Sequence, residues 1–124
     1  MMNFLSVAIG GALGAVARYG LGVWISNKWI QSFPLHTFLI NITGSFLLGF
    51  LNTLFLDKLT VSPEMRIALT VGFLGAFTTF STFGYEAINL LKEGSVATAG
   101  FYTLSSIIVG FVGVFLGMGL ARLI

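Results

Sequence analysis

The polar residues best suited to bind an ion or a ligand lie in one stretch of otherwise apolar sequence, GFLGAFTTFSTFGYE, at residues 72–86. Thr and Gly are weak helix formers, and hydroxyl side chains compete with the backbone for its hydrogen bonds. One interpretation is a broken helix, whose free carbonyls line a watery cavity or coordinate a cation. The other is an unbroken helix whose hydroxyls bond back to the preceding turn. These residues alone do not favour either interpretation.

Two phenylalanines and one carboxamide are candidates for contacts with an anion. Phe80 and Phe83 share a helix face at i and i+3, and the edge of an aromatic ring is positive enough to face an anion. Asn41 lies between Thr37 and Ser45 in a polar stripe, and its N–H groups can also donate to an anion. The alternative interpretations are ring packing among 13 phenylalanines and an amide that joins two helices.

Arg18 and Glu86 are the only charged residues well inside apolar stretches, and ionisable residues within a membrane are functional candidates by default. Both lie within about two turns of a predicted helix end. Snorkelling, or a mutual or intersubunit ion pair, is therefore an alternative of at least equal weight. Tyr102 and Ser106 contribute hydroxyl groups from the last apolar stretch.

The composition indicates a membrane protein. Of the 124 residues, 56% are hydrophobic and 8% are charged, whereas roughly 25% are charged in an average soluble domain. Cysteine is absent, which excludes disulfides and thiolate catalysis, and the single histidine cannot form a histidine cluster. The net charge of +2 is spread along the chain and gives no nucleic-acid footprint. Without a catalytic constellation, we expect no enzymatic activity.

Four stretches have the length of about 20 mainly apolar residues that a membrane-crossing helix needs. They are residues 4–25, 37–56, 65–91 and 96–120. Ser62-Pro63-Glu64 predicts the start of the third helix, with Ser62 as N-cap and Pro63 at the first helical position. The sequence therefore predicts an all-α membrane protein, with residues 1–124 in a single four-helix transmembrane domain.

Glycine is abundant, at 16 of 124 residues, and two pairs are spaced four residues apart. Small residues allow helix backbones to approach closely in lipid, where the hydrophobic effect does not drive helix association. Gly10 and Gly14 predict such a close-packing face in the first stretch, and Gly113 and Gly117 predict one in the fourth.

Positive charge in the connections gives little orientation signal. With four spans both termini lie on one side, where the basic residues are Lys58, Arg66 and Arg122. The other side has Lys28, Lys92 and, if its side chain snorkels that way, Arg18. Because the excess of Lys and Arg normally sets orientation, this balance favours insertion both ways and pairing of opposite copies. The alternative is that one orientation wins by a small margin.

Together these features resemble the Fluc (CrcB) fluoride channel family over essentially the whole chain. The resemblance is carried by GGALGAVARYG, by HTFLINITGSFLLG and, most specifically, by GFLGAFTTFSTFGYE. It implies a third helix broken near its middle and an antiparallel, dual-topology homodimer in a prokaryotic plasma membrane. It further implies two fluoride pores, passive export of cytoplasmic fluoride and a structural sodium ion (Na+) at the dimer centre.

The resemblance also assigns roles to residues of this chain. Six would line the fluoride pathway: Phe80, Phe83, Asn41, Thr37, Ser106 and Tyr102. Backbone carbonyls of Gly75 and Thr78 would bind sodium. Arg18 would lie near the polar vestibule, and Glu86 takes the place of the family's acid after the Phe pair.

The sequence departs from the family pattern at a few positions. His36 precedes Thr37 where the family pattern has Gly. In the fourth span, the family pattern continues a track of hydroxyl residues one and two turns past Ser106, but here those positions are Gly110 and Val114. The track is therefore expected to be shorter, and conduction slower or differently gated.

Two other classes of protein compete with a channel. A small dual-topology, proton-coupled multidrug transporter has a similar size, but it needs an acid near mid-membrane, usually in the first span. This first span has no acid, and Glu86 lies off-centre. A non-transporting assembly subunit would explain the glycines but not the polar third span.

Overall fold

The apolar stretches form helices throughout the computed structural model, which describes residues 1–124. The elements are α1 (Met2–Lys28), α2 (Leu35–Asp57), α3 (Pro63–Ile67), the π-helix η1 (Ala68–Leu74), α4 (Gly75–Phe77), α5 (Phe80–Lys92) and α6 (Val96–Leu123). Four helical segments are long and apolar enough to cross a membrane, with α3 to α5 forming the third, Pro63–Lys92. The all-helical fold with four such segments is as predicted.

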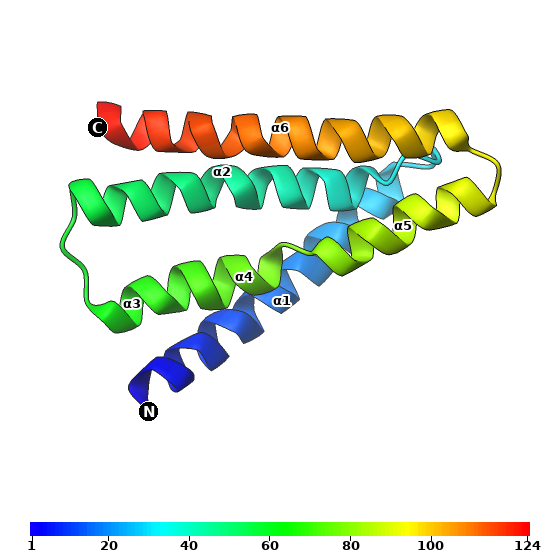
Figure 1. Cartoon of the computed structure of the whole chain (residues 1–124). Helices are drawn as coiled ribbons and strands as arrows, with labels where there is room; N and C mark the ends of the chain where they lie inside the picture. The colour runs from blue at the N-terminus through cyan, green and yellow to red at the C-terminus, as the bar shows by residue number, and fades with distance from the viewer.

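The four segments alternate in direction. Figure 1 shows α2 and α6 side by side and running the same way, while α1 crosses obliquely beside α3, α4 and α5 and runs the opposite way. Both termini lie at the same end of the molecule, as expected for four spans. The helices extend one to three residues beyond most of the predicted limits, because hydropathy marks the apolar core of a span and not its polar end turns.

Glycine brings α2 and α6 into backbone contact. A Cβ on Gly117 would overlap the Phe46 carbonyl oxygen, and a Cβ on Gly49 would overlap that of Val114. Gly113 also faces α2, where a Cβ would lie 3.5 Å from the Ile42 carbonyl oxygen. The close-packing face predicted from Gly113 and Gly117 is confirmed.

The other glycine pair joins α1 to the π-helix. A Cβ on Gly10 would overlap the Ala68 carbonyl oxygen, and one on Gly14 would overlap the Phe73 carbonyl oxygen. From the π-helix side of this contact, a Cβ on Gly72 would meet the Val7 carbonyl oxygen of α1 at 3.0 Å. This second predicted packing face is also confirmed, and it fixes α1 against the segment that leads into the third span's polar centre.

The start of the third span follows its sequence signal. Ser62 is extended and its hydroxyl oxygen accepts a hydrogen bond from the Met65 N–H at 3.2 Å. Pro63 occupies the first turn, and Glu64 is favourably placed near the positive end of the helix dipole. The predicted N-cap is therefore confirmed.

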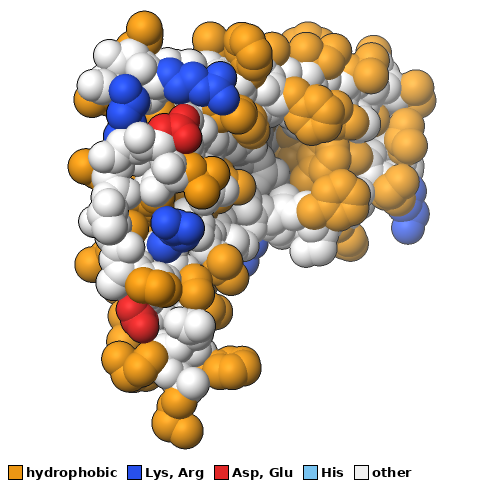
Figure 2. All heavy atoms as spheres, turned by 60° about the vertical axis from the view of Figure 1, so that its left-hand side comes forward, with side chains coloured by type: hydrophobic (Ala, Val, Ile, Leu, Met, Phe, Trp, Pro, Cys, Tyr) orange, Lys and Arg blue, Asp and Glu red, His pale blue; other side chains and the backbone are white.

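Few residues are buried in the interior, and the outer surface is largely apolar. Only 20 of the 124 residues are buried, and they form small clusters such as Ile40, Leu74 and Phe77. Figure 2 shows hydrophobic side chains over much of one side of the molecule, with few charged groups among them. Such a surface suits lipid or another apolar partner, because water would disfavour exposed apolar patches of this extent.

Candidate functional site

The third span leaves helical geometry at two threonines. Helix α4 ends at Phe77, Thr78 and Thr79 have extended backbone, and α5 begins at Phe80. Thr79 caps α5, since its hydroxyl oxygen accepts the Thr82 N–H at 3.2 Å. The Thr78 hydroxyl donates to the Leu74 carbonyl oxygen at 3.0 Å, and so closes the end of α4. Both hydroxyls thus satisfy helix ends at the place where the backbone changes direction.

Asn41 on α2 holds this extended segment through two hydrogen bonds to one residue. Its Nδ2 donates to the Thr79 carbonyl oxygen at 2.9 Å, and the Thr79 N–H donates to Asn41 Oδ1 at 2.8 Å. In a continuous helix the Thr79 N–H would instead reach the Gly75 carbonyl oxygen four residues back. A carboxamide has two N–H donors, so one donor of Asn41 is left for another acceptor.

Gly44 makes space for the extended segment. A Cβ at this position would overlap Thr78 Cγ2, so α2 can approach the third span here only without a side chain. Thr78 lies between α4 and α5, and its carbonyl oxygen accepts no hydrogen bond from a backbone N–H. The segment therefore combines close packing with an unsatisfied carbonyl, which would be costly in lipid without a partner or water.

An open cavity of about 530 Å³, which we name the central cavity, lies beside this segment. It brings together six of the residues singled out from the sequence: Asn41, Gly75, Thr78, Phe80, Phe83 and Ser106. The Ser106 hydroxyl is buried and has no hydrogen-bond partner. Gly110 and Val114, which stand where the family pattern would continue the polar track past Ser106, line the same cavity.

Three aromatic rings form a row leading away from the central cavity. The Phe80 and Phe83 ring centres are 6.0 Å apart, and Phe83 meets Tyr102 edge-on at 5.1 Å. Phe80 is 83% exposed, whereas Tyr102 is completely buried. The row therefore runs from an open face of the chain into its interior.

Glu86 has two side-chain partners at the inner end of this row. The Tyr102 hydroxyl donates to Glu86 Oε1 at 2.9 Å, and His36 Nε2 lies 3.2 Å from Glu86 Oε2. The mutual pair of Arg18 with Glu86, one of the alternatives from sequence, does not form in this chain. Arg18 lines a recess that does not include Glu86, and the carboxylate has its own partners on α2 and α6.

Arg18 lies in a different recess, the Arg18 groove, of about 430 Å³. Thr37, Thr79 and Thr82 share its walls. The structure thus divides the predicted pathway residues between two recesses, with Thr37 on the Arg18 groove and Phe80 on the central cavity. Thr79 lines both recesses, so the extended segment forms part of the partition between them.

Sequence reasoning missed the contacts that Thr79, Gly44 and His36 make. Thr79 carried one local signal, because Thr is a favoured N-cap before a helical run. No signal in the sequence links it to Asn41, which is 38 residues away. His36 was noted as a departure, but its pairing with Glu86 depends on how α2 packs against α5.

Comparison with known proteins places these features in a family context. The sequence matches the family described as CrcB-like protein, Camphor Resistance (CrcB), over residues 5–118. A protein of Roseiflexus sp. (strain RS-1) named "Fluoride-specific ion channel FluC" is 43% identical over 123 residues, which is 99% of each chain. A protein of the same name from Acidobacterium capsulatum is 48% identical over 94% of each chain. Another, from Chloroflexus aurantiacus (strain J-10-fl), is 43% identical over 98% of this chain and 97% of its own.

Proposed function

The chain belongs to the CrcB family, and from this membership and the geometry of the central cavity we propose that it is a fluoride-specific ion channel. Its four apolar helices and its bacterial relatives make it a multi-pass protein of a prokaryotic plasma membrane. In this proposal the channel exports cytoplasmic fluoride by passive electrodiffusion, with no covalent chemistry.

The observation that carries the proposal is the set of free donors around the central cavity. Asn41 has one uncommitted N–H and the buried Ser106 hydroxyl has no partner. The edges of the Phe80 and Phe83 rings add weak positive potential. Removing fluoride from water into an apolar medium costs tens of kcal/mol, of the order estimated for any small ion. Several modest donors in line replace water stepwise without trapping the ion.

The remaining pathway residues extend this route in the proposal. Tyr102 continues the aromatic row inward from Phe83. Thr37 and Arg18 form a polar vestibule in the Arg18 groove, where the guanidinium attracts anions. Glu86 is a structural charge that orients the Tyr102 hydroxyl.

We propose that the working unit is an antiparallel homodimer with two pores. The exposure of Phe80 and the openness of the central cavity support it, since a second subunit would enclose both. The balance of basic residues between the two sides supports dual insertion. Because the chain has no cysteine, a single cysteine introduced near either terminus tests this topology. A membrane-impermeant thiol reagent should label half of the copies from each side, and labelling from one side only would contradict it.

A structural sodium ion at the centre of this dimer is part of the proposal. The fit rests on the Thr78 carbonyl oxygen, which accepts no backbone hydrogen bond, and on Gly75, whose usual helical donor binds Asn41 instead. Hard oxygen ligands of this kind suit an alkali cation, and two opposed segments would supply a full set. When bound, the ion would contribute positive potential near the anion path.

The proton-coupled multidrug transporter gains no support from the structure. Glu86, its only candidate acid within a span, is engaged by Tyr102 and His36.

Expression in a bacterium that lacks its own fluoride exporter tests the proposed function in cells. We expect growth at fluoride concentrations that stop the parent strain. Equal sensitivity to fluoride, with the protein present in the membrane, would contradict the proposal.

A further inference from the structure

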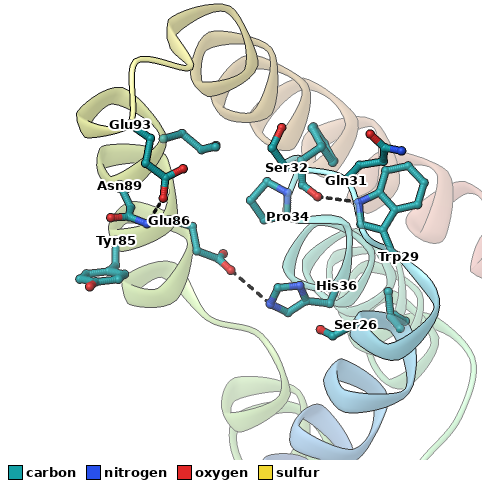
Figure 3. Close-up of a pocket in the computed structure, with 13 residues that line it drawn as sticks. Ser26, Trp29, Gln31, Ser32, Pro34, His36, Tyr85, Glu86, Asn89 and Glu93 are labelled. Carbon is teal, nitrogen blue, oxygen red and sulfur yellow. Dashed lines mark hydrogen bonds and ion pairs between the residues drawn. The ribbon is translucent and has the colours of Figure 1, made fainter.

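A second cavity, which we name the His36 cavity, opens where the first connection meets the third span. Figure 3 shows His36 on α2 and Glu86 on α5 pointing toward one another across it. The cavity holds about 290 Å³ and has other polar walls, including Ser26, Asn89 and Glu93. The His36 and Glu86 side chains are 34% and 18% exposed, respectively. Water and protons therefore reach this pair.

His36 also lines the Arg18 groove. Its sequence neighbour Thr37 is only 2% exposed and lines that groove as well. The imidazole thus stands between the His36 cavity and the recess that contains the Arg18 side chain. A charge on this ring acts on both.

A continuous set of contacts links His36 to the aromatic row. His36 binds one carboxylate oxygen of Glu86, and Tyr102 donates to the other. The Tyr102 ring then meets Phe83 edge-on. The imidazole therefore helps to fix the carboxylate that orients Tyr102, although it does not touch the central cavity itself.

We propose that His36 is a positioning residue whose protonation sets the rate of anion passage. This inference rests on the proposed function. Histidine is the side chain that changes charge between pH 5 and 8. Protonation of His36 offsets the negative charge of Glu86 and strengthens the contact between the two side chains. It also lowers the electrostatic repulsion that Glu86 exerts on an anion approaching the Arg18 groove. Flux is therefore higher when this ring is protonated.

The other charged and titratable groups around His36 do not reverse this sign. On α5, Tyr85 and Glu93 line the same cavity as Glu86, and Asn89 donates to Glu93 at 3.1 Å. On α1, Arg18 and Tyr19 line the adjoining groove. On α6, Tyr102 faces Glu86. Two carboxylates and one guanidinium thus line the two recesses that His36 borders, and protonation of His36 moves this set of charges from net negative toward neutral.

The test is fluoride release from loaded proteoliposomes at pH 8 and pH 6. Release from protein-free vesicles is subtracted at each pH, because hydrogen fluoride crosses bilayers unaided. We expect the wild-type rate to be about threefold higher at pH 6, the size of effect that one unit charge has at a hydrated mouth. His36→Gln, or His36→Gly if the first variant does not fold, should abolish the difference between the two pH values.

Glu93→Gln is the matched control, because it removes an exposed carboxylate from the same cavity without touching the pair. It should keep the wild-type pH profile. His36 is the only histidine, so its imidazole NMR signal is unambiguous, and its titration midpoint should coincide with that of the flux. A pH-independent wild-type rate, or a pH dependence that survives in His36→Gln, would overturn the role of His36 and leave the channel standing. Absence of release at both pH values would refute the channel itself.

Discussion

The side-chain amide of Asn41 makes two hydrogen bonds with the backbone of Thr79, donating at 2.9 Å and accepting at 2.8 Å. The pairing copies the way two neighbouring strands bond, and it replaces the helical bond that the Thr79 N–H has lost. It also settles which amide atom is nitrogen, because the Thr79 N–H requires an acceptor and its carbonyl requires a donor. Asn41 thereby stabilises the extended segment and still offers one N–H to the central cavity.

Asn41→Ala should lower both stability and fluoride flux. The substitution leaves a partly buried N–H and carbonyl of Thr79 without partners, which costs about 1–3 kcal/mol of unfolding free energy. Unfolding in detergent, followed by tryptophan fluorescence, measures the loss. Asn52→Ala, an exposed asparagine on the same helix, is the control and should change neither quantity. Wild-type stability in Asn41→Ala would show that the two hydrogen bonds do not hold the segment.

Gly44→Ala should disrupt the same segment by overpacking. The new methyl group overlaps Thr78 Cγ2, and such a clash costs about 1–3 kcal/mol. Adding Thr78→Ser removes Cγ2 while keeping the hydroxyl that bonds Leu74, so the double variant should recover most of the loss. Gly100→Ala is the control, because no atom lies within 4 Å of its new methyl group. Additive losses in the double variant would rule out the proposed contact.

Ser106→Ala should separate function from stability. Its hydroxyl is buried without a partner, so removing it should leave stability unchanged or raise it by up to about 1–3 kcal/mol. Flux should nevertheless fall, because one donor of the path is lost. Ser105→Ala serves for comparison, since the Ser105 hydroxyl bonds back to the Phe101 carbonyl oxygen at 2.5 Å and should leave flux unchanged. A Ser106→Ala variant that conducts normally would remove this serine from the pathway.

Phe80→Leu should reduce fluoride flux with little change in stability. The ring is 83% exposed within one chain, so the substitution should change the unfolding free energy of the single-chain fold by less than about 0.5 kcal/mol, and leucine keeps an apolar contact for the proposed second subunit. Leucine keeps an apolar side chain but has no positive ring edge for an anion. Phe4→Leu, at a ring that is 82% exposed near the N-terminus, controls for loss of a surface aromatic. Equal flux from both variants would mean that the ring edge is not part of the path.

Much of the fold could be predicted because its signals are local. Four runs of apolar residues give the four spans, and Ser62 followed by Pro63 gives the start of the third. The glycine pairs also predicted their packing faces, since spacing by four places both on one side of a helix. The sequence did not predict which helix each glycine pair contacts. It also did not predict the π-helix that Gly10 and Gly14 contact.

The candidate site was harder to predict because its contacts join distant parts of the chain. From the hydroxyl-rich stretch alone, a broken helix and a continuous helix were equally acceptable interpretations. In the structure Thr79 is extended, and it is hydrogen-bonded to Asn41, 38 residues away. His36 and Glu86 were each visible as unusual residues, yet their contact depends on the packing of α2 against α5. The roles of the pathway and sodium residues stay predictions until flux and ion binding are measured.

Fluoride release from proteoliposomes tests the central claim most directly. Vesicles loaded with potassium fluoride, or with potassium chloride for comparison, are given valinomycin so that potassium balances the anion's charge. Ion-selective electrodes then follow each halide. The proposed function predicts rapid fluoride release that depends on the protein, with chloride release no faster than from protein-free vesicles. Fluoride release equal to that of protein-free vesicles would contradict it.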